Sequence, residues 1–233
     1  MLALESVNAC YGKAHILFDL SLRIGTGEIV ALLGRNGAGK STALKSIIGL
    51  VPVTSGKIEF RGECIEGREP WEIARRGLGY VAEDRRIFSA LTVRENLETG
   101  RQAARAELSA WTPEKLFEIF PNLALVQDRP AGRISGGEQQ MLAVARTLMG
   151  NPLCILLDEP SEGLAPMIVE RMAVAVRELR SHGVSVLLSE QNLRFAAAIA
   201  DRTYIIEAGR VRYSGSMAGL MASEEVRREY LAP

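Results

Sequence analysis

Residues Gly34–Thr42 read G-R-N-G-A-G-K-S-T, and this stretch decides which fold the chain adopts. It matches G-x-x-x-x-G-K-[ST], the pattern of a phosphate-binding loop between a strand and a helix. The preceding run, Glu28–Leu33, is apolar and typical of a buried strand, and Ala43–Leu50 carries apolar residues at helical spacing. Because both flanks fit, the stretch predicts a loop that binds a nucleoside triphosphate rather than a chance glycine-rich turn.

The residues of this loop have predicted parts in binding. Glycines let the backbone direct several N–H groups at one anion, and the positive end of the following helix adds to the attraction. Lys40 is expected to reach the β- and γ-phosphates, and the Ser41 hydroxyl to hold Mg²⁺, so ATP and Mg²⁺ are the expected ligands. The predicted nucleotide contacts in this loop are Gly34, Arg35, Asn36, Gly37, Ala38, Gly39, Lys40, Ser41 and Thr42.

Composition and charge argue against several other classes of protein. The 233 residues include 28 Lys and Arg and 28 Asp and Glu, so the basic excess usual in nucleic-acid-binding proteins is absent and no nucleic-acid partner is expected. No apolar run approaches the roughly 20 residues that span a bilayer, and the first residues do not resemble a signal peptide. The three cysteines fit free thiols in a reducing compartment, so we expect a cytoplasmic protein.

Strand and helix patterns alternate along most of the chain. This alternation predicts an α/β fold with a mainly parallel sheet and ligands at the carboxyl ends of its strands. Between about residues 85 and 149 helices predominate, which indicates a helical lobe inserted into a core of about 1–84 and 150–233. Helices are predicted at Pro70–Arg76, Thr92–Arg105, Pro113–Phe120, Met141–Met149, Met167–Leu179, Leu193–Ala200 and Met217–Leu231. Besides Glu28–Leu33, strands are predicted at Leu2–Ala9, Ile16–Ile24, Lys57–Arg61, Gly77–Ala82, Leu153–Leu157, Val184–Leu188, Thr203–Ile206 and Val211–Tyr213.

Candidate functional side chains lie at strand ends outside the loop. Asp158 and Glu159 follow the buried strand Leu153–Leu157, where Asp158 is placed to hold Mg²⁺ and Glu159 to polarise a water for attack on the γ-phosphate. An isolated Asp-Glu pair is usually only solvated, but downstream of a phosphate loop it favours the functional interpretation. Tyr11 can stack on adenine or serve only as an aromatic anchor near a turn.

A second anion-binding arrangement lies at Ile134–Gln140, which reads I-S-G-G-E-Q-Q before a helical run. Ser135, Gly136, Gly137 and Glu138 would offer a hydroxyl, free N–H groups and the positive end of a helix. Such an arrangement alone is often only a turn. Because the chain already has one phosphate site, a natural reason for a second is a nucleotide bound mainly by another subunit.

With the loop at Gly34, I-S-G-G-E-Q-Q and I-L-L-D-E-P in this order, the chain resembles the ATP-binding subunits of ABC transporters over nearly its whole length. The resemblance implies a single ABC ATP-binding domain, 1–233, with a P-loop NTPase core, an antiparallel β subdomain and a helical lobe. It also implies that two such subunits meet head to tail, with each ATP held between one subunit's phosphate loop and the other's Ser135–Glu138 segment. Transmembrane permease subunits would bind the pair at the inner face of the cell membrane.

Three departures from the usual family motifs suggest a narrower resemblance. Glu83 stands where a glutamine usually contacts Mg²⁺, Gln191 where a histidine usually contacts the γ-phosphate, and Ala165 where an aspartate usually ends the loop after Pro160. Such departures occur together in ATP-binding subunits of branched-chain amino acid importers, which also work with an extracytoplasmic solute-binding protein. Since glutamine cannot take up a proton as histidine does, we expect Glu159 to activate water and Gln191 only to position.

Other tasks stay open at this point. The same subunit type also serves uptake of urea, other amides and other amino acids. A soluble ABC ATPase of DNA repair or ribosomes usually has coiled-coil insertions or tandem cassettes, which this chain lacks. A non-catalytic nucleotide-dependent module fits poorly with the intact Lys40, Asp158 and Glu159.

Overall fold

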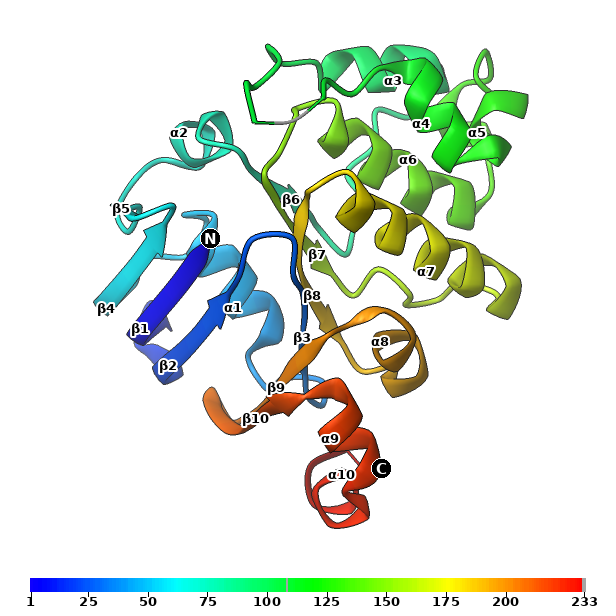
Figure 1. Cartoon of the computed structure of the whole chain (residues 1–233). Helices are drawn as coiled ribbons and strands as arrows, with labels where there is room; N and C mark the ends of the chain where they lie inside the picture. Colours follow the sequence, from blue (N-terminus) through cyan, green and yellow to red (C-terminus); the bar gives the residue numbers. More distant parts are fainter. Residues whose placement is uncertain (108, 232–233) are drawn as a thin grey trace.

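The computed structural model describes residues 1–107 and 109–231 and contains two sheets with helices around them (Figure 1). The larger sheet has the strand order β10-β9-β3-β8-β7-β6, and the smaller one the order β2-β1-β4-β5. The strands are β1 (Leu2–Tyr11), β2 (Ala14–Ile24), β3 (Ile29–Leu33), β4 (Val53–Phe60), β5 (Glu63–Cys64), β6 (Leu78–Val81), β7 (Cys154–Asp158), β8 (Ser185–Glu190), β9 (Arg202–Glu207) and β10 (Arg210–Ser216).

The helices cover both faces of the larger sheet and form a group beside it. They are α1 (Lys40–Ile47), α2 (Pro70–Arg75), α3 (Val93–Thr99), α4 (Pro113–Ile119), α5 (Pro121–Leu125), the 3₁₀ turn η1 (Ala131–Arg133), α6 (Gly136–Leu148), α7 (Pro166–Ser181), α8 (Leu193–Ile199), α9 (Met217–Ala222) and α10 (Glu224–Leu231). The chain thus has the α/β architecture that its sequence predicts.

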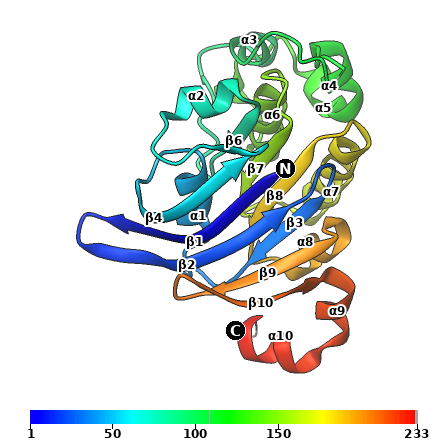
Figure 2. The ribbon, with the colours of Figure 1, turned by 60° about the vertical axis from the view of Figure 1, so that its left-hand side comes forward.

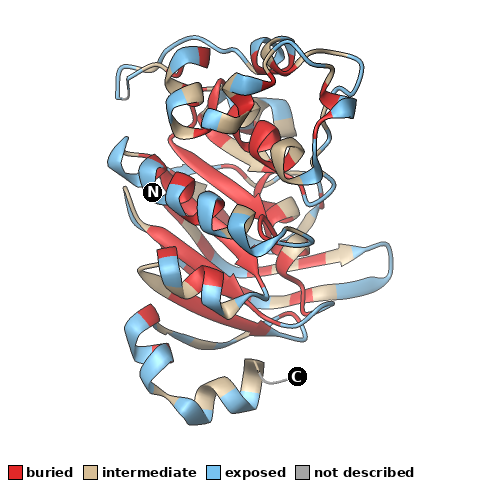
Figure 3. Cartoon of the chain, turned by 90° about the vertical axis from the view of Figure 1, so that its right-hand side faces the viewer, coloured by how far each residue is buried: buried red, intermediate tan, exposed pale blue. Residues whose placement is uncertain are grey.

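The larger sheet is parallel from β6 to β9, and only β10 runs antiparallel. Its central strands β3, β7 and β8 consist entirely of buried residues, in keeping with their continuous apolar runs (Figure 3). The smaller sheet is antiparallel throughout. Because the parallel strands share one direction, β3, β7 and β8 bring their carboxyl ends to the same edge.

Two hydrophobic clusters lie on opposite faces of the larger sheet. One contains the smaller sheet and α1, which packs against β7 and β8 on one side and β2 on the other (Figure 2). The other contains α7 and α8 together with the helices of the lobe. Residues of α3 and α6 belong to the same cluster as Ile29 and Leu33 of β3, so the lobe is continuous with this core. The boundaries predicted for the lobe therefore stay a prediction.

Four predicted helices differ from the observed ones by more than two residues or by a break. The one expected over Ala43–Leu50 spans Lys40–Ile47. The helix expected at Thr92–Arg105 ends at Thr99, and beyond it the Gln102 amide donates to the carbonyl oxygen of Met149 at 3.1 Å instead of continuing the helix. The helix expected from Met141 begins at Gly136, where Ser135 caps it. The last helix is interrupted at Ser223.

The remaining sequence expectations concern cysteines and membrane spans. Cys10, Cys64 and Cys154 are unpaired, as expected. No helix among residues 1–107 and 109–231 is long and apolar enough to cross a membrane.

Candidate active site

The phosphate loop joins β3 to α1, as predicted, and its glycines meet two different requirements. Gly37 and Gly39 have φ of 75° and 108°, conformations that strain any residue with a side chain. Gly34 instead allows a close approach, since a Cβ there would be 2.4 Å from the carbonyl oxygen of Ile206. The loop is therefore shaped by both backbone conformation and packing, and its amides at the start of α1 are available to an anion.

Lys40 is buried at the first position of α1, and its ammonium group has three partners. It donates to the carbonyl oxygens of Gly34 at 2.9 Å and Arg35 at 3.1 Å, and it lies 3.0 Å from the carboxylate of Glu159. The side chains of Lys40 and Glu159 are 3% and 7% exposed. The ammonium group is thus held inside the loop, where predicted phosphate contacts would be made.

Glu159 follows β7 with φ of 47°, a strained value for a residue other than glycine. Its amide donates to the carbonyl and hydroxyl oxygens of Ser189, both at 3.1 Å, which holds this conformation. The side-chain nitrogen of Gln191, Nε2, donates to Glu159 Oε2 at 3.0 Å and to Asn36 Oδ1 at 2.6 Å. The structure therefore brings the predicted Glu159 and Gln191 together with the phosphate loop.

Asp158, the last residue of β7, is 1% exposed and accepts three hydroxyl hydrogen bonds. Oδ1 accepts from Ser41 at 2.9 Å and from Ser189 at 2.6 Å, and Oδ2 accepts from Tyr80 at 3.1 Å. Neighbouring ligands of an octahedral Mg²⁺ at about 2.1 Å lie about 3.0 Å apart, close to the 2.9 Å between Ser41 and Asp158, so these two predicted magnesium residues fit this ion. Oxygen donors are also its preferred type.

The pKa values of three carboxyl groups at or near Glu159 are shifted, and not all in the same direction. Burial raises the pKa of Glu159, but hydrogen bonds from Gln191 and Lys40 outweigh it and hold that pKa below its ordinary value. A hydrogen bond shared with Glu159 raises the pKa of Glu162, and the charges of Glu159 and Glu83 act in the same direction. Burial raises the pKa of Glu190. Glu159 is accordingly the carboxylate held ionised beside the loop.

Two predicted site residues lie further out. Glu83 is exposed in the loop after β6 and close enough to Glu162 for their charges to interact. Within residues 1–107 and 109–231, no group of three or more His, Cys, Asp or Glu side chains is arranged to hold a metal. Tyr11 is about half exposed at the end of β1. A magnesium contact for Glu83 and an adenine contact for Tyr11 stay predictions.

The second predicted anion site lies at the start of α6. The Ser135 hydroxyl and amide both donate to the Glu138 carboxylate at 2.7 Å, a capping box after which Gly136 is exposed and Gly137 partly buried. α6 belongs to the cluster on one face of the sheet and α1 to the cluster on the other. The Ser135–Glu138 segment and the phosphate loop therefore stand at two different helix ends on opposite faces.

Sequence reasoning assigned no role to four residues that support the site. Ser189 and Tyr80 bind Asp158, Glu190 binds the loops after β7 and β8, and the Gly209 amide donates to the Ala38 carbonyl oxygen at 2.9 Å. Ser189 and Glu190 could have been found from the sequence, because they are polar residues at the end of an apolar strand. No local pattern marks Tyr80 or Gly209, whose contacts arise from distant segments.

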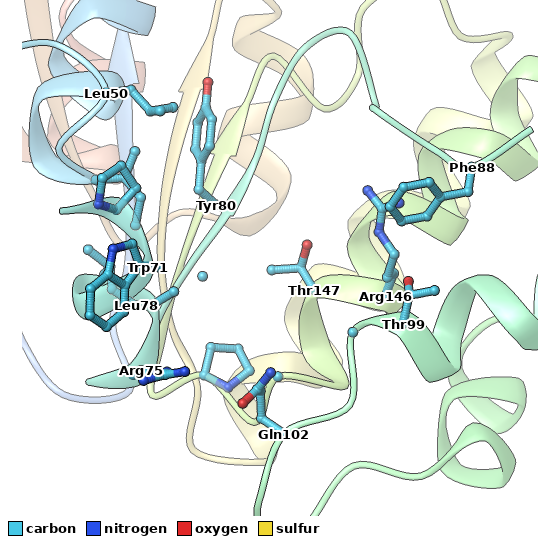
Figure 4. Close-up of a pocket in the computed structure, with 17 residues that line it drawn as sticks. Leu50, Trp71, Arg75, Leu78, Tyr80, Phe88, Thr99, Gln102, Arg146 and Thr147 are labelled. Carbon is cyan, nitrogen blue, oxygen red and sulfur yellow. The ribbon is translucent and has the colours of Figure 1, made fainter.

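A groove of about 630 Å³ lies between α2 and β6 on one side and α3 and α6 on the other (Figure 4). Trp71 and Arg75 stand on one wall, and Phe88 and Arg146 on the other. Trp71 and Phe88 are 57% and 52% exposed. Tyr80 also lines the groove while donating to Asp158, so this side chain connects the groove to the candidate active site.

The fold and the site together define a nucleotide-binding protein of the P-loop class. A family model described as ABC transporter matches residues 17–162, more than half of the chain. The chain therefore belongs to the ABC transporter family and is its ATP-binding, ATP-hydrolysing subunit type.

Curated relatives cover almost the whole chain. It is 43% identical over 231 residues to the high-affinity branched-chain amino acid transport ATP-binding protein BraG of Pseudomonas aeruginosa, with 99% of both chains covered. It is 36% identical to the probable branched-chain amino acid transport ATP-binding protein LivF of Archaeoglobus fulgidus, over 98% of this chain and 97% of that one. Identity to the lipopolysaccharide export system ATP-binding protein LptB of Haemophilus influenzae is 35%, over 99% and 97%.

Solved structures agree with this assignment. A nucleotide-free ATP-binding cassette from an ABC transporter superposes with a TM-score of 0.84 at 27% identity, over 97% of this chain and 96% of that one. The ADP conformation of MJ1267, an ATP-binding cassette of an ABC transporter, gives a TM-score of 0.81 at 27% identity over the same shares.

Proposed function

We propose that this chain is the ATP-hydrolysing subunit of an importer for branched-chain amino acids. The observation that carries the proposal is the 43% identity to BraG across 99% of both chains. The replacements at Glu83, Gln191 and Ala165 support it, because they resemble the pattern of such subunits.

Hydrolysis would proceed at the edge where β3, β7 and β8 end. Amides of the phosphate loop and the ammonium group of Lys40 would bind the phosphates. Glu159 would accept a proton from the attacking water, whose oxygen bonds to the γ-phosphorus as the bond to the β–γ bridging oxygen breaks, giving ADP and phosphate. Gln191, hydrogen-bonded to both Glu159 and Asn36, would orient this end of the site.

Mg²⁺ would be held by Ser41 and Asp158, with Glu83 as a further candidate ligand. When bound, the ion neutralises charge on the β- and γ-phosphates. Ser189 and Tyr80 fix the Asp158 carboxylate through their hydroxyl groups. Tyr11 would stack on the adenine base.

A second ATP-binding subunit, a sister chain or a second copy, would complete each site head to tail. The start of α6 supports this arrangement, since the exposed Ser135 and Gly136 lie at a different helix end from the phosphate loop of the same chain. Ser135, Gly136 and Gly137 would contact the nucleotide held by the other subunit, and Glu138 would keep Ser135 in place through the capping box.

The permease subunits would bind in the groove between α2 and α6, at the inner face of the cell membrane. Its exposed Trp71 and Phe88 offer apolar area, and the buried Nη1 of Arg146 has no hydrogen-bond partner within residues 1–107 and 109–231. A docking segment with an apolar face fits these exposed rings. Through Tyr80 and Asp158, occupancy of the groove would act on the site.

Lipopolysaccharide export is a second candidate, favoured by the 35% identity to LptB over 99% of this chain. Uptake of urea or other amides and a soluble ATPase unconnected with transport are further alternatives. The first test is to co-purify the chain with the membrane and ATPase proteins encoded beside it, and then measure ATPase activity in proteoliposomes with the binding protein added.

Each candidate predicts a different result in this experiment. Stimulation by leucine, isoleucine or valine supports the branched-chain importer. Stimulation by urea alone would show that the importer transports urea instead. Stimulation by lipopolysaccharide without any binding protein identifies the exporter. Absence of a membrane partner overturns the transport proposal and leaves a soluble ATPase.

A further inference from the structure

Glu190 is a buried carboxylate that hydrolysis as described above does not use. It is the last residue of β8, is 2% exposed, and lies beside Leu33, the last residue of β3. An ionised group is costly to bury unless hydrogen bonds compensate. The hydrogen-bond partners of Glu190 therefore indicate its role.

The two oxygens of Glu190 bind two different loops. Oε1 accepts from the amide of Ser161, in the loop after β7, at 3.0 Å. Oε2 accepts from the amides of Gln191 and Asn192, in the loop after β8, both at 3.2 Å. One carboxylate thus joins the segment that follows Glu159 to the segment that carries Gln191.

The same two loops also meet at the reacting end of the site. Gln191 donates to Glu159 at 3.0 Å, and the Glu159 amide donates to Ser189. The two loops are therefore joined twice: once by the Glu190 carboxylate, and once by the hydrogen bond between the side chains of Gln191 and Glu159. A shift of one loop relative to the other would change the separation of Gln191 and Glu159.

We propose that Glu190 is a positioning residue for ATP hydrolysis, whose carboxylate ties the loops after β7 and β8 together and so holds Gln191 and Glu159 in register. This inference rests on hydrolysis at the site, and it does not depend on the cargo.

The chemistry of the contacts requires a carboxylate. Three backbone N–H groups donate to it, and the Ser161 hydroxyl is a further hydrogen-bond partner. Only a group that accepts on both oxygens can receive the three N–H groups. In Glu190→Gln one of the two positions becomes an NH₂ group, which faces either Ser161 or the Gln191–Asn192 amides. One loop then loses its connection while the shape of the side chain is kept.

The test compares Glu190→Gln with Glu28→Gln in the full chain, together with the partner subunits that co-purify with it. Glu28 is a control because it pairs with Arg202 and accepts from the Gly25 amide at 2.7 Å, at the opposite end of β3. We expect Glu190→Gln to lower kcat about 10- to 100-fold with ATP affinity within about threefold of wild type. Glu28→Gln should leave kcat unchanged.

Two further measurements separate positioning from a merely structural role. Hydrogen exchange should accelerate at the amides of Ser161 or of Gln191 and Asn192 in Glu190→Gln. In a double-mutant cycle, Glu190→Gln should cost much less rate in a Gln191→Ala background than alone.

A wild-type kcat, additive effects in the cycle, or a parallel loss of ATP affinity would each overturn the proposal. If Glu190→Gln does not fold, Glu190→Asp carries the test, because it keeps the charge but cannot reach both loops. Failure of both variants to fold would show that Glu190 serves folding instead.

Discussion

Lys40 Nζ lies 3.0 Å from Glu159 Oε1, so the cation of the phosphate loop and the proposed base of hydrolysis form a buried ion pair. Both groups are also those expected to act on the terminal phosphate. Binding of a nucleotide must therefore exchange this pair for new contacts, and the free chain keeps two buried charges neutralised by each other.

Lys40→Met should destabilise the nucleotide-free chain by about 3 kcal/mol, because it leaves the Glu159 carboxylate buried without its cation. Glu159→Gln in the same chain should recover most of this loss, since the uncompensated charge is gone. Urea unfolding of the two single variants and the double variant checks the expectation. Equal stability of Lys40→Met and the double variant would contradict it.

Glu159→Gln should reduce ATP turnover at least about 100-fold while ATP affinity stays within about threefold. The amide keeps the shape of the side chain but does not accept the proton of the attacking water. Single-turnover kinetics and equilibrium ATP binding measure the two effects. Glu170→Gln, an exposed residue of α7, provides a control of equal charge change, and undiminished turnover in Glu159→Gln would refute the assignment.

Gln191→His should make turnover depend on pH around 6.5, where a histidine titrates. Below this pH the imidazolium would pair with Glu159 and weaken it as a base, so the rate relative to wild type should fall. Gln191→Ala should instead lower turnover about tenfold by a factor independent of pH, since it removes positioning alone. A pH-independent ratio for Gln191→His would argue against contact between residue 191 and Glu159 during turnover.

Glu162→Gln should raise the thermal stability of the free chain at pH 7.5 and have less effect near pH 5. The pKa of Glu162 is raised in the folded chain above its ordinary value of 4.5, so its ionised form opposes folding. The favourable contribution is present at low pH and is lost as pH rises through the folded pKa. Differential scanning calorimetry at both pH values checks the sign, and the effect should be small because Glu162 is exposed.

Trp71→Ala and Arg146→Ala should weaken co-purification of the permease while ATP affinity is unchanged. Both side chains line the groove, and neither contacts the phosphate loop. Val174→Ala is the control, because this exposed residue of α7 lies outside the groove. Retention of the permease by both groove variants would place the docking surface elsewhere on the chain.

Much of the fold and site could be predicted because the informative residues are contiguous. The stretch from Gly34 to Thr42 and the pair Asp158–Glu159 lie next to apolar runs whose strand character is local. Element boundaries were less predictable. The helix after Thr92 stops at Thr99, and beyond it the Gln102 amide donates to the carbonyl oxygen of Met149, a residue distant in the sequence.

The amino-acid sequence by itself determined the class of protein, the phosphate loop and the acidic pair, since these depend on residue type and short spacing. Only the tertiary structure decided which side chains meet: Tyr80 and Ser189 on Asp158, Gln191 on Glu159, and Glu190 between two loops. The physical reason is strand order. β7 and β8 are neighbours with Asp158 beside Ser189, and this adjacency follows from how the whole sheet packs around its two cores.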